Sequence, residues 1–313
     1  MIHQLLPKGK AGGYFALATT SILWGTTWVA SKIAVSENLP PFQMASIRQG
    51  CGGLIFLIFF LLYKRLRLPT MKQFGWLLVL ALLMFVFANG LSTWSLKYIP
   101  TGLSALIGAL YPFSVVIIER LFFNTRNLTT LTMVGLLMGI AGVGIVFYEN
   151  ALHYHPAGYF FGLVLSVMAM LSWSAGTMFI ARNKLKMNPY YATGWQMLIG
   201  SMILFIIAET MQPLIPLREV SMRIWLSIVY LVIFGSIISF IAFIYSMKKL
   251  PAAISSLYAY INPLVAMVTA AIVLNEKLTM NIVWGALVTL AGVFLVNYSI
   301  KRNHQKIIAE PEQ

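Results

Sequence analysis

The chain has 313 residues, of which 59% are hydrophobic and only 10% are charged. Soluble domains carry about 25% charged residues, so this composition excludes a soluble globular protein. The formal net charge is +14, and all eight acidic residues are glutamate. Because the basic residues fall in short clusters between apolar segments, we interpret them as marks of cytoplasmic loops and predict no nucleic-acid partner.

Apolar segments that are too long for helices in a soluble core recur along most of the chain. A helix needs about 20 apolar residues to cross a bilayer, and charged or proline-rich joints divide the chain into ten such segments. We therefore predict an all-α integral membrane protein. The ten predicted transmembrane helices are residues 11–34, 42–63, 74–96, 101–122, 128–148, 157–181, 189–209, 221–246, 251–274 and 280–300.

The distribution of Lys and Arg predicts how these helices are oriented. With the N-terminus inside, 16 of the 22 basic residues fall in cytoplasmic segments, four fall outside and two lie within the spans. Cytoplasmic loops are enriched in Lys and Arg, so we expect both termini to be cytoplasmic. The single cysteine, Cys51, has no intrachain partner, and no disulfide is expected.

The two halves of the chain share a sequence pattern. Residues 94–100 match residues 245–251 as aromatic, Ser, apolar, Lys, any, apolar, Pro, and each half then runs twelve residues to a second proline, Pro112 or Pro263. The other corresponding pairs are Trp24 with Trp173, Pro41 with Pro189, Gly135 with Gly285, and Gly142 with Gly292.

The repeat predicts two five-helix units, residues 1–150 and 151–313. Because five is an odd number, the second unit must cross the membrane in the opposite direction to the first. Inverted repeats of this kind are typical of secondary transporters, whose two halves exchange conformations around a site near the membrane midplane. We therefore predict a transporter that works by alternating access around a central cavity.

The segment from Trp24 to Trp28, Arg48, the helices of Pro112 and Pro263, and the motif Asn275-Glu276-Lys277-Leu278 resemble the EamA family of the drug/metabolite transporter superfamily. The resemblance covers both halves. It implies ten spans in two inverted repeats and export of amino acids, other metabolites or drugs across a bacterial inner membrane. One departure is that Glu276 corresponds to Thr125 in the first half, so a symmetric pair of glutamates is not expected.

Helices interrupted by proline release backbone carbonyls, which are tolerated at membrane depth only inside the bundle or beside a water-filled cavity. Tyr111 directly precedes Pro112, and Tyr258 and Asn262 lie one turn apart before Pro263. Two alternatives stay open: these side chains line the pathway, or they only pack and satisfy their own helices. The predicted substrate-binding residues are Trp24, Asn89, Tyr111, Trp173, Tyr258 and Asn262.

Charged residues inside membranes are functional candidates by default. Arg48 lies about two turns into its span, where it can bind either helix-end carbonyls or an anionic group. Lys32 lies at the external end of the first span, so we expect its side chain to extend to the membrane surface. Glu119 and Glu276 fall near helix ends, which argues against proton coupling through a buried acid. Trp28 lies near an interface and fits an aromatic belt.

An enzyme is not expected, because all four histidines lie in tails or loops, aspartate is absent and no nucleophile or metal pattern occurs. We predict no cofactor or metal, and without a G-x-x-x-x-G-K-[ST] loop we predict no direct use of ATP. The candidate cavity has aromatic rings and hydroxyl groups but few charges, which favours neutral, zwitterionic or amphipathic small molecules over phosphorylated sugars or nucleotides. Glycine spacing is interpreted as packing between neighbouring helices, which favours a monomer over a homodimer. An uptake carrier and a membrane receptor or scaffold are the alternatives.

Overall fold

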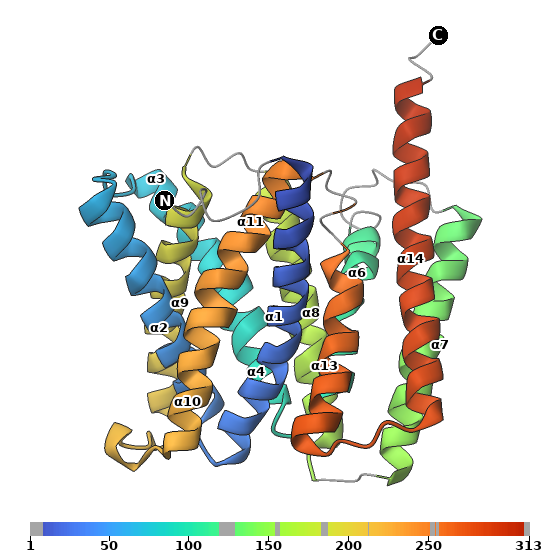
Figure 1. The fold of residues 1–313 in the computed structure, drawn as a ribbon, viewed down its shortest axis with the longest axis horizontal. Helices are drawn as coiled ribbons and strands as arrows, with labels where there is room; N and C mark the ends of the chain where they lie inside the picture. The colour runs from blue at the N-terminus through green and yellow to red at the C-terminus, as the bar shows by residue number, and fades with distance from the viewer. Residues whose placement is uncertain are drawn as a thin grey trace.

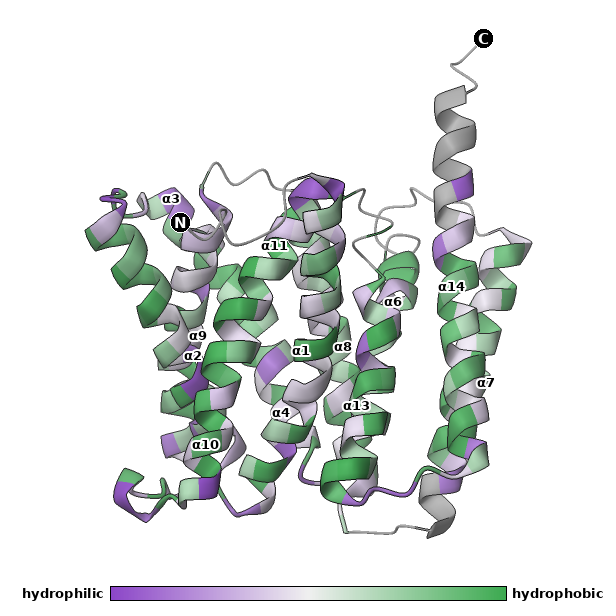
Figure 2. Cartoon of the chain, viewed as in Figure 1, coloured by the Kyte–Doolittle hydropathy of each residue, from purple (hydrophilic) through white to green (hydrophobic). Residues whose placement is uncertain are grey.

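The structure is a computed structural model that describes residues 9–118, 129–153, 157–182, 187–211, 213–250, 254 and 257–309. Within these ranges every regular element is helical, and the helices stand side by side in one bundle (Figure 1). Apolar residues dominate the middle of the bundle, and hydrophilic residues gather at its two ends (Figure 2). This distribution is the one expected of a protein surrounded by lipid.

The helices follow the predicted segments closely. Within the described residues, eight helical stretches are long and apolar enough to cross a membrane. The elements are α1 (Lys10–Ser36), α2 (Pro41–Ile58), η2 (Phe59–Tyr63), α3 (Met71–Leu80), η3 (Ala81–Gly90), α4 (Leu91–Ser95), α5 (Thr101–Ala109), α6 (Tyr111–Ile118), α7 (Thr130–His153), α8 (Tyr159–Arg182), α9 (Pro189–Met211), η5 (Leu217–Glu219), α10 (Met222–Tyr230), η6 (Leu231–Ile238), α11 (Ser239–Lys249), α13 (Tyr258–Leu274) and α14 (Met280–Ala309).

Helices α1 and α13 occupy the other two predicted segments. Helix α13 is 17 residues long within the described part of the chain. Helix α1 has 27 residues, but polar residues such as Thr20, Thr27 and Ser31 interrupt its apolar sequence and are buried in the bundle. The number of ten membrane crossings therefore stays a prediction. Glu119 and Thr125 lie outside the described residues.

Helices α7 and α14 pack closely through glycine. A Cβ atom added to Gly135 would lie 2.8 Å from the carbonyl oxygen of Gly292, and one added to Gly142 would lie 2.5 Å from that of Gly285. The contacts pair rising residue numbers on α7 with falling numbers on α14, so the two helices run antiparallel. The glycines pack neighbouring helices of this chain, as the sequence predicted.

Helices α2 and α9 pack in the same way. The Ser46 hydroxyl donates to the Ser201 carbonyl at 3.0 Å, and the Ser201 hydroxyl donates to the Ser46 carbonyl at 2.9 Å. A Cβ atom on Gly53 would lie 2.9 Å from the carbonyl oxygen of Gly194. These contacts again pair rising with falling numbers, so α2 and α9 are antiparallel.

The inner helices depart from regular α geometry at corresponding places. The π-helical segments η3 and η6 begin 150 residues apart, each in the middle of a long apolar helix. Between α5 and α6 the helix breaks at Leu110, two residues before Pro112. π-Helical turns are frequent at functional sites because they displace side chains and free backbone groups.

We expect Gly142→Ala to destabilise the protein by about 1–3 kcal/mol, because the added methyl group would overlap the backbone of α14. The matched control is Gly144→Ala, which lies on the same helix and has no atom within 4 Å of an added Cβ. The control should be neutral or stabilising by up to about 1 kcal/mol, since alanine favours helix. Thermal unfolding of the purified proteins measures both changes, and equal stability of the two variants would contradict the packing assigned to α7 and α14.

Candidate functional site

A cavity of about 180 Å³ lies between helices of both halves. Helices α1, α5, α6, α8 and α13 contribute to its wall, together with α2, η3, α4 and α11. The structure brings together all six residues that the sequence analysis selected; their role in binding a solute stays a prediction. The six residues that line the cavity are Trp24, Asn89, Tyr111, Trp173, Tyr258 and Asn262.

Aromatic rings from four helices meet on one side of the cavity. The ring centroids of Trp24 and Trp173 lie 6.4 Å apart with an edge-to-face arrangement, and those of Trp24 and Tyr258 lie 5.4 Å apart. Tyr111 and Tyr258 stack at 6.5 Å. The Trp24 indole N–H donates to the Gly235 carbonyl in η6 at 3.1 Å, which fixes the orientation of the ring.

Polar side chains form another part of the wall. Asn89, in η3, accepts a hydrogen bond through Oδ1 from Nε2 of Gln49 at 2.9 Å. The Ser104 hydroxyl lies 3.1 Å from the hydroxyls of both Ser95 and Ser166, so α4, α5 and α8 are joined by a chain of hydroxyl groups. The cavity therefore offers neutral donors and acceptors beside its aromatic surface.

Trp28 does not belong to an interfacial belt, which corrects the expectation from the sequence. Its indole N–H donates to Oδ1 of Asn262 at 2.9 Å, and both residues line the cavity. The Asn262 amide nitrogen makes no hydrogen bond to the described residues. The alternative in which Asn262 serves only to satisfy the carbonyl released by Pro263 therefore has no hydrogen bond to support it within this part of the chain.

Lys32 does not extend to the membrane surface, which is a second correction. Its Nζ donates to the carbonyls of Leu96 and Ile99 at 2.5 Å and 3.1 Å, at the end of α4 and in the turn that follows.

Glu276, in the connection between α13 and α14, accepts hydrogen bonds from the backbone N–H groups of Thr101 at 2.9 Å and Gly102 at 3.4 Å. A carboxylate is favourable at a helix N-terminus. These contacts join the helices at the end of the bundle where α1 ends.

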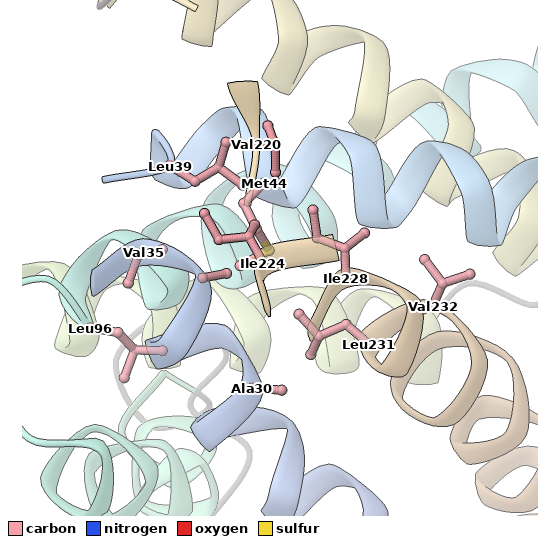
Figure 3. Packing of buried hydrophobic residues seen from close by; sticks show 11 residues of the cluster. Ala30, Val35, Leu39, Met44, Leu96, Val220, Ile224, Ile228, Leu231 and Val232 are labelled. Atoms are coloured by element: carbon pink, nitrogen blue, oxygen red, sulfur yellow. The ribbon is translucent and has the colours of Figure 1, made fainter. Parts of the chain in front are cut away.

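A cluster of buried apolar side chains lies at the same end of the bundle, and Figure 3 shows how these side chains pack. They come from the last turns of α1, the first turns of α2, α10 with the start of η6, and the connections that carry Leu39, Leu96 and Val220. We call this group the packed cluster. Its members are Ala30, Ala34, Val35, Leu39, Met44, Leu96, Val220, Ile224, Ile228, Leu231 and Val232.

At the opposite end, where α1 begins, the bundle contains an open groove of about 890 Å³. Its walls are α3, the end of α8, the start of α9 and α11, and Lys72 and Lys248 lie at its margin. Three residues, Met84, Trp173 and Phe240, line both this groove and the central cavity. The central cavity therefore neighbours the groove on one side, and through Leu96 it neighbours the packed cluster on the other.

Comparison with known proteins places this architecture in a family. The model of the EamA-like transporter family matches residues 11–148 and again residues 160–298. The chain belongs to the EamA-like transporter family. The two matches cover both halves, so this EamA-like protein consists of two family repeats in tandem.

Curated relatives carry transporter names. The chain is 31% identical over 290 residues to the inner membrane transporter YedA of Escherichia coli (strain K12), a match that covers 91% of this chain and 88% of YedA. It is 22% identical over 289 residues to the transporter YoaV of Bacillus subtilis (strain 168), covering 91% and 97%. A protein of known crystal structure has the same fold, with a TM-score of 0.64, 17% identity and coverage of 92% and 97%. This EamA-like protein is a multi-pass membrane transporter.

Three further cavity residues on α1 were not among the predicted site residues, although the sequence carries a signal for them. Thr27, Trp28 and Ser31 line the cavity with Trp24. Their spacing of three or four residues places them on one helix face. Extending the face of Trp24 by two turns toward the C-terminal end of α1 would have found them.

We expect Tyr258→Phe and Asn262→Ala each to change the apparent affinity for a transported solute about three- to tenfold, because each loses about one hydrogen bond of ~1 kcal/mol. Membrane abundance should stay normal. Tyr298→Phe is the matched control, since Tyr298 is exposed on the outer surface of α14. Concentration-dependent transport and quantification of folded protein measure the outcome. Loss of folded Asn262→Ala together with unchanged transport by Tyr258→Phe would remove both residues from the site.

Proposed function

We propose that this protein is a secondary-active transporter that exports small organic solutes by alternating access around the central cavity. The observation that carries the proposal is the relation between the open groove and the packed cluster. The open groove adjoins the cavity from the end where α1 begins, and the packed cluster closes the end where α1 finishes. A solute in the cavity would then reach one side of the membrane at a time.

Contacts between the halves support an inverted repeat with units at 1–150 and 151–313 and ten crossings. The corresponding helices α2 and α9 are antiparallel, and so are α7 and α14. The π-helical segments η3 and η6 also correspond. Opposite directions of corresponding helices are what an odd number of spans per unit requires.

The open groove and the packed cluster occupy equivalent positions under this repeat. Residues in the two halves correspond at separations of 148 to 151 positions, as in the sequence motifs. Members of the packed cluster therefore have counterparts that line the groove. The equivalent pairs are Ala30 and Phe179, Leu39 and Met187, Met44 and Ala192, Leu96 and Met247, Ile224 and Gln73, and Leu231 and Leu80.

This equivalence supplies a physical route to the second state. The packed cluster and the groove are each built from helices of both halves, and the helices of one are the repeat equivalents of the helices of the other, so exchanging the two arrangements opens the packed cluster and closes the groove. The exchange needs no new type of packing, because each half adopts the geometry that the other half already has. Two states of similar free energy are what alternating access requires.

The distribution of charge supports a direction for the open state. The groove opens at the end that carries Lys72 and Lys248, and cytoplasmic segments are rich in Lys and Arg. In a bacterial inner membrane with both termini cytoplasmic, this state faces the cytoplasm and receives solute from it. Export agrees with the function that the family resemblance implies.

The cavity wall supports a small organic solute. It combines aromatic rings, hydroxyl groups and amides, and its only charged member among the described lining residues is Arg48. Phosphorylated sugars and nucleotides are bound by several converging Lys or Arg side chains. Neutral, zwitterionic or amphipathic solutes resembling amino acids fit this wall better. A monomer provides the whole cavity, and the proposed cycle requires no cofactor.

Metabolite export tests the function directly. We expect cells that overproduce the protein to release more of at least one neutral or zwitterionic metabolite, and deletion cells to retain it. Gly108→Leu is the inactive control, because a Cβ at Gly108 faces the cavity with its nearest atom 3.7 Å away and the larger side chain would fill the space. Uptake in place of release would reverse the direction. No solute movement in cells or liposomes, or a dominant change in a phosphorylated compound, would contradict the proposal.

A further inference from the structure

We propose that Arg48 binds an anionic group of the transported solute, and that the substrates are organic carboxylates with one apolar or aromatic body. This inference rests on the proposed transport function and names the substrate class of the same cavity. It starts from the position of the only charged side chain in the described cavity wall.

Arg48 is held inside the bundle by α2 and η6. Its side chain is only 6% exposed, and its Nε donates to the Ser236 hydroxyl at 3.2 Å. A Cβ atom added to Gly235 would lie 3.0 Å from Nη2 of Arg48. Because glycine has no side chain, the guanidinium has room to pass η6 at this position. The guanidinium thus reaches the cavity wall beside η6.

The guanidinium has no counter-charge among the described residues. The described cavity wall contains no glutamate, and the described salt bridges join Arg218 to Glu219 and Arg223 to Glu37 on the surface. No described hydrogen bond uses Nη1 or Nη2, and neither atom is among the buried polar atoms that lack a partner. Each Nη group therefore keeps some accessible surface, on a residue that lines the cavity.

An unpaired cation inside a membrane protein is unfavourable, because burial removes its hydration. Helix-end carbonyls do not offset this cost here, since the recorded partner of Arg48 is a hydroxyl. A carboxylate fits the available donors, because its two oxygens accept two parallel N–H groups from a guanidinium. Asn89 adds a neutral donor, because its Oδ1 already accepts from Gln49 and its NH₂ group is left to donate.

The remainder of the wall indicates the other part of the solute. The rings of Trp24, Trp173 and Tyr258 form an apolar surface in the same cavity. An ammonium group would meet no carboxylate in the described wall. A monocarboxylate whose body is apolar or aromatic therefore matches the cavity, and a zwitterion binds through the same carboxylate.

The repeat supplies a substitution that the fold accommodates. Arg48 corresponds to Gln196, which lines the open groove in the other half. Arg48→Gln therefore removes the charge while introducing a side chain found at the equivalent position. Arg48→Lys keeps the charge but loses the paired N–H geometry. Arg218→Gln is the matched control, because it removes a cation that is 86% exposed.

The test measures binding of matched solutes to purified protein in nanodiscs. The probes are 3-phenylpropionate and L-phenylalanine, each compared with its carboxamide, and the readouts are dissociation constants and the unfolding temperature. We expect the wild type and Arg218→Gln to prefer the carboxylates. Arg48→Gln should lose at least tenfold in carboxylate affinity with little change for the amides, and Arg48→Lys should fall between them. Without solute, Arg48→Gln should unfold at a temperature no lower than the wild type.

Several outcomes would overturn the proposal. They are equal binding of carboxylates and amides by the wild type, no carboxylate binding at all, or full carboxylate affinity in Arg48→Gln. If Arg48→Gln does not fold, unchanged carboxylate affinity in Arg48→Lys has the same consequence. A wild-type protein that exports neutral solutes but does not discriminate for carboxylates would retain the transport function and lose this inference, so the two failures are distinct.

Discussion

The rest of the structure depends on close antiparallel contact between corresponding helices of the two halves. In lipid, helix association relies on van der Waals packing and polar contacts, because there is no hydrophobic gain from leaving an apolar solvent. Glycines let α7 and α14 approach at one side of the bundle, and paired serines join α2 and α9 at the other (Figure 1). The inner helices are thereby held between two fixed pairs.

Several inner helices have irregular backbones beside the cavity, and these irregularities serve it. A free carbonyl is unfavourable in lipid unless it finds a donor inside the bundle. The Gly235 carbonyl in η6 receives the indole N–H of Trp24, and Arg48 passes the same glycine. The π-helical segment therefore positions both an aromatic ring and a cation. The break before Pro112 similarly presents Tyr111 to the cavity.

Much of this architecture could be predicted from the sequence, because membrane burial leaves a strong periodic signal. Hydropathy located the helices, and the repeated prolines and tryptophans selected five residues that line one cavity together with Asn89, which was selected as a polar side chain of the third span. The partners of Lys32 and Trp28 could not be predicted, since they depend on which turns of distant helices meet. Depth in the membrane was a poor guide there: both side chains point inward to specific acceptors. The π-helical segments carry no sequence signal that distinguishes them from regular helix.

The central claim is that the open groove and the packed cluster exchange roles. Distances between spin labels at two equivalent pairs of exposed residues test it most directly, with Cys51 replaced by serine. One pair, Lys72 and Lys248, spans the groove; the other, Arg223 and Lys97, occupies the corresponding positions at the packed end. On addition of a transported solute, the account predicts a population in which the first distance shortens and the second lengthens. Distances that both stay fixed, or that change in the same direction, would contradict it.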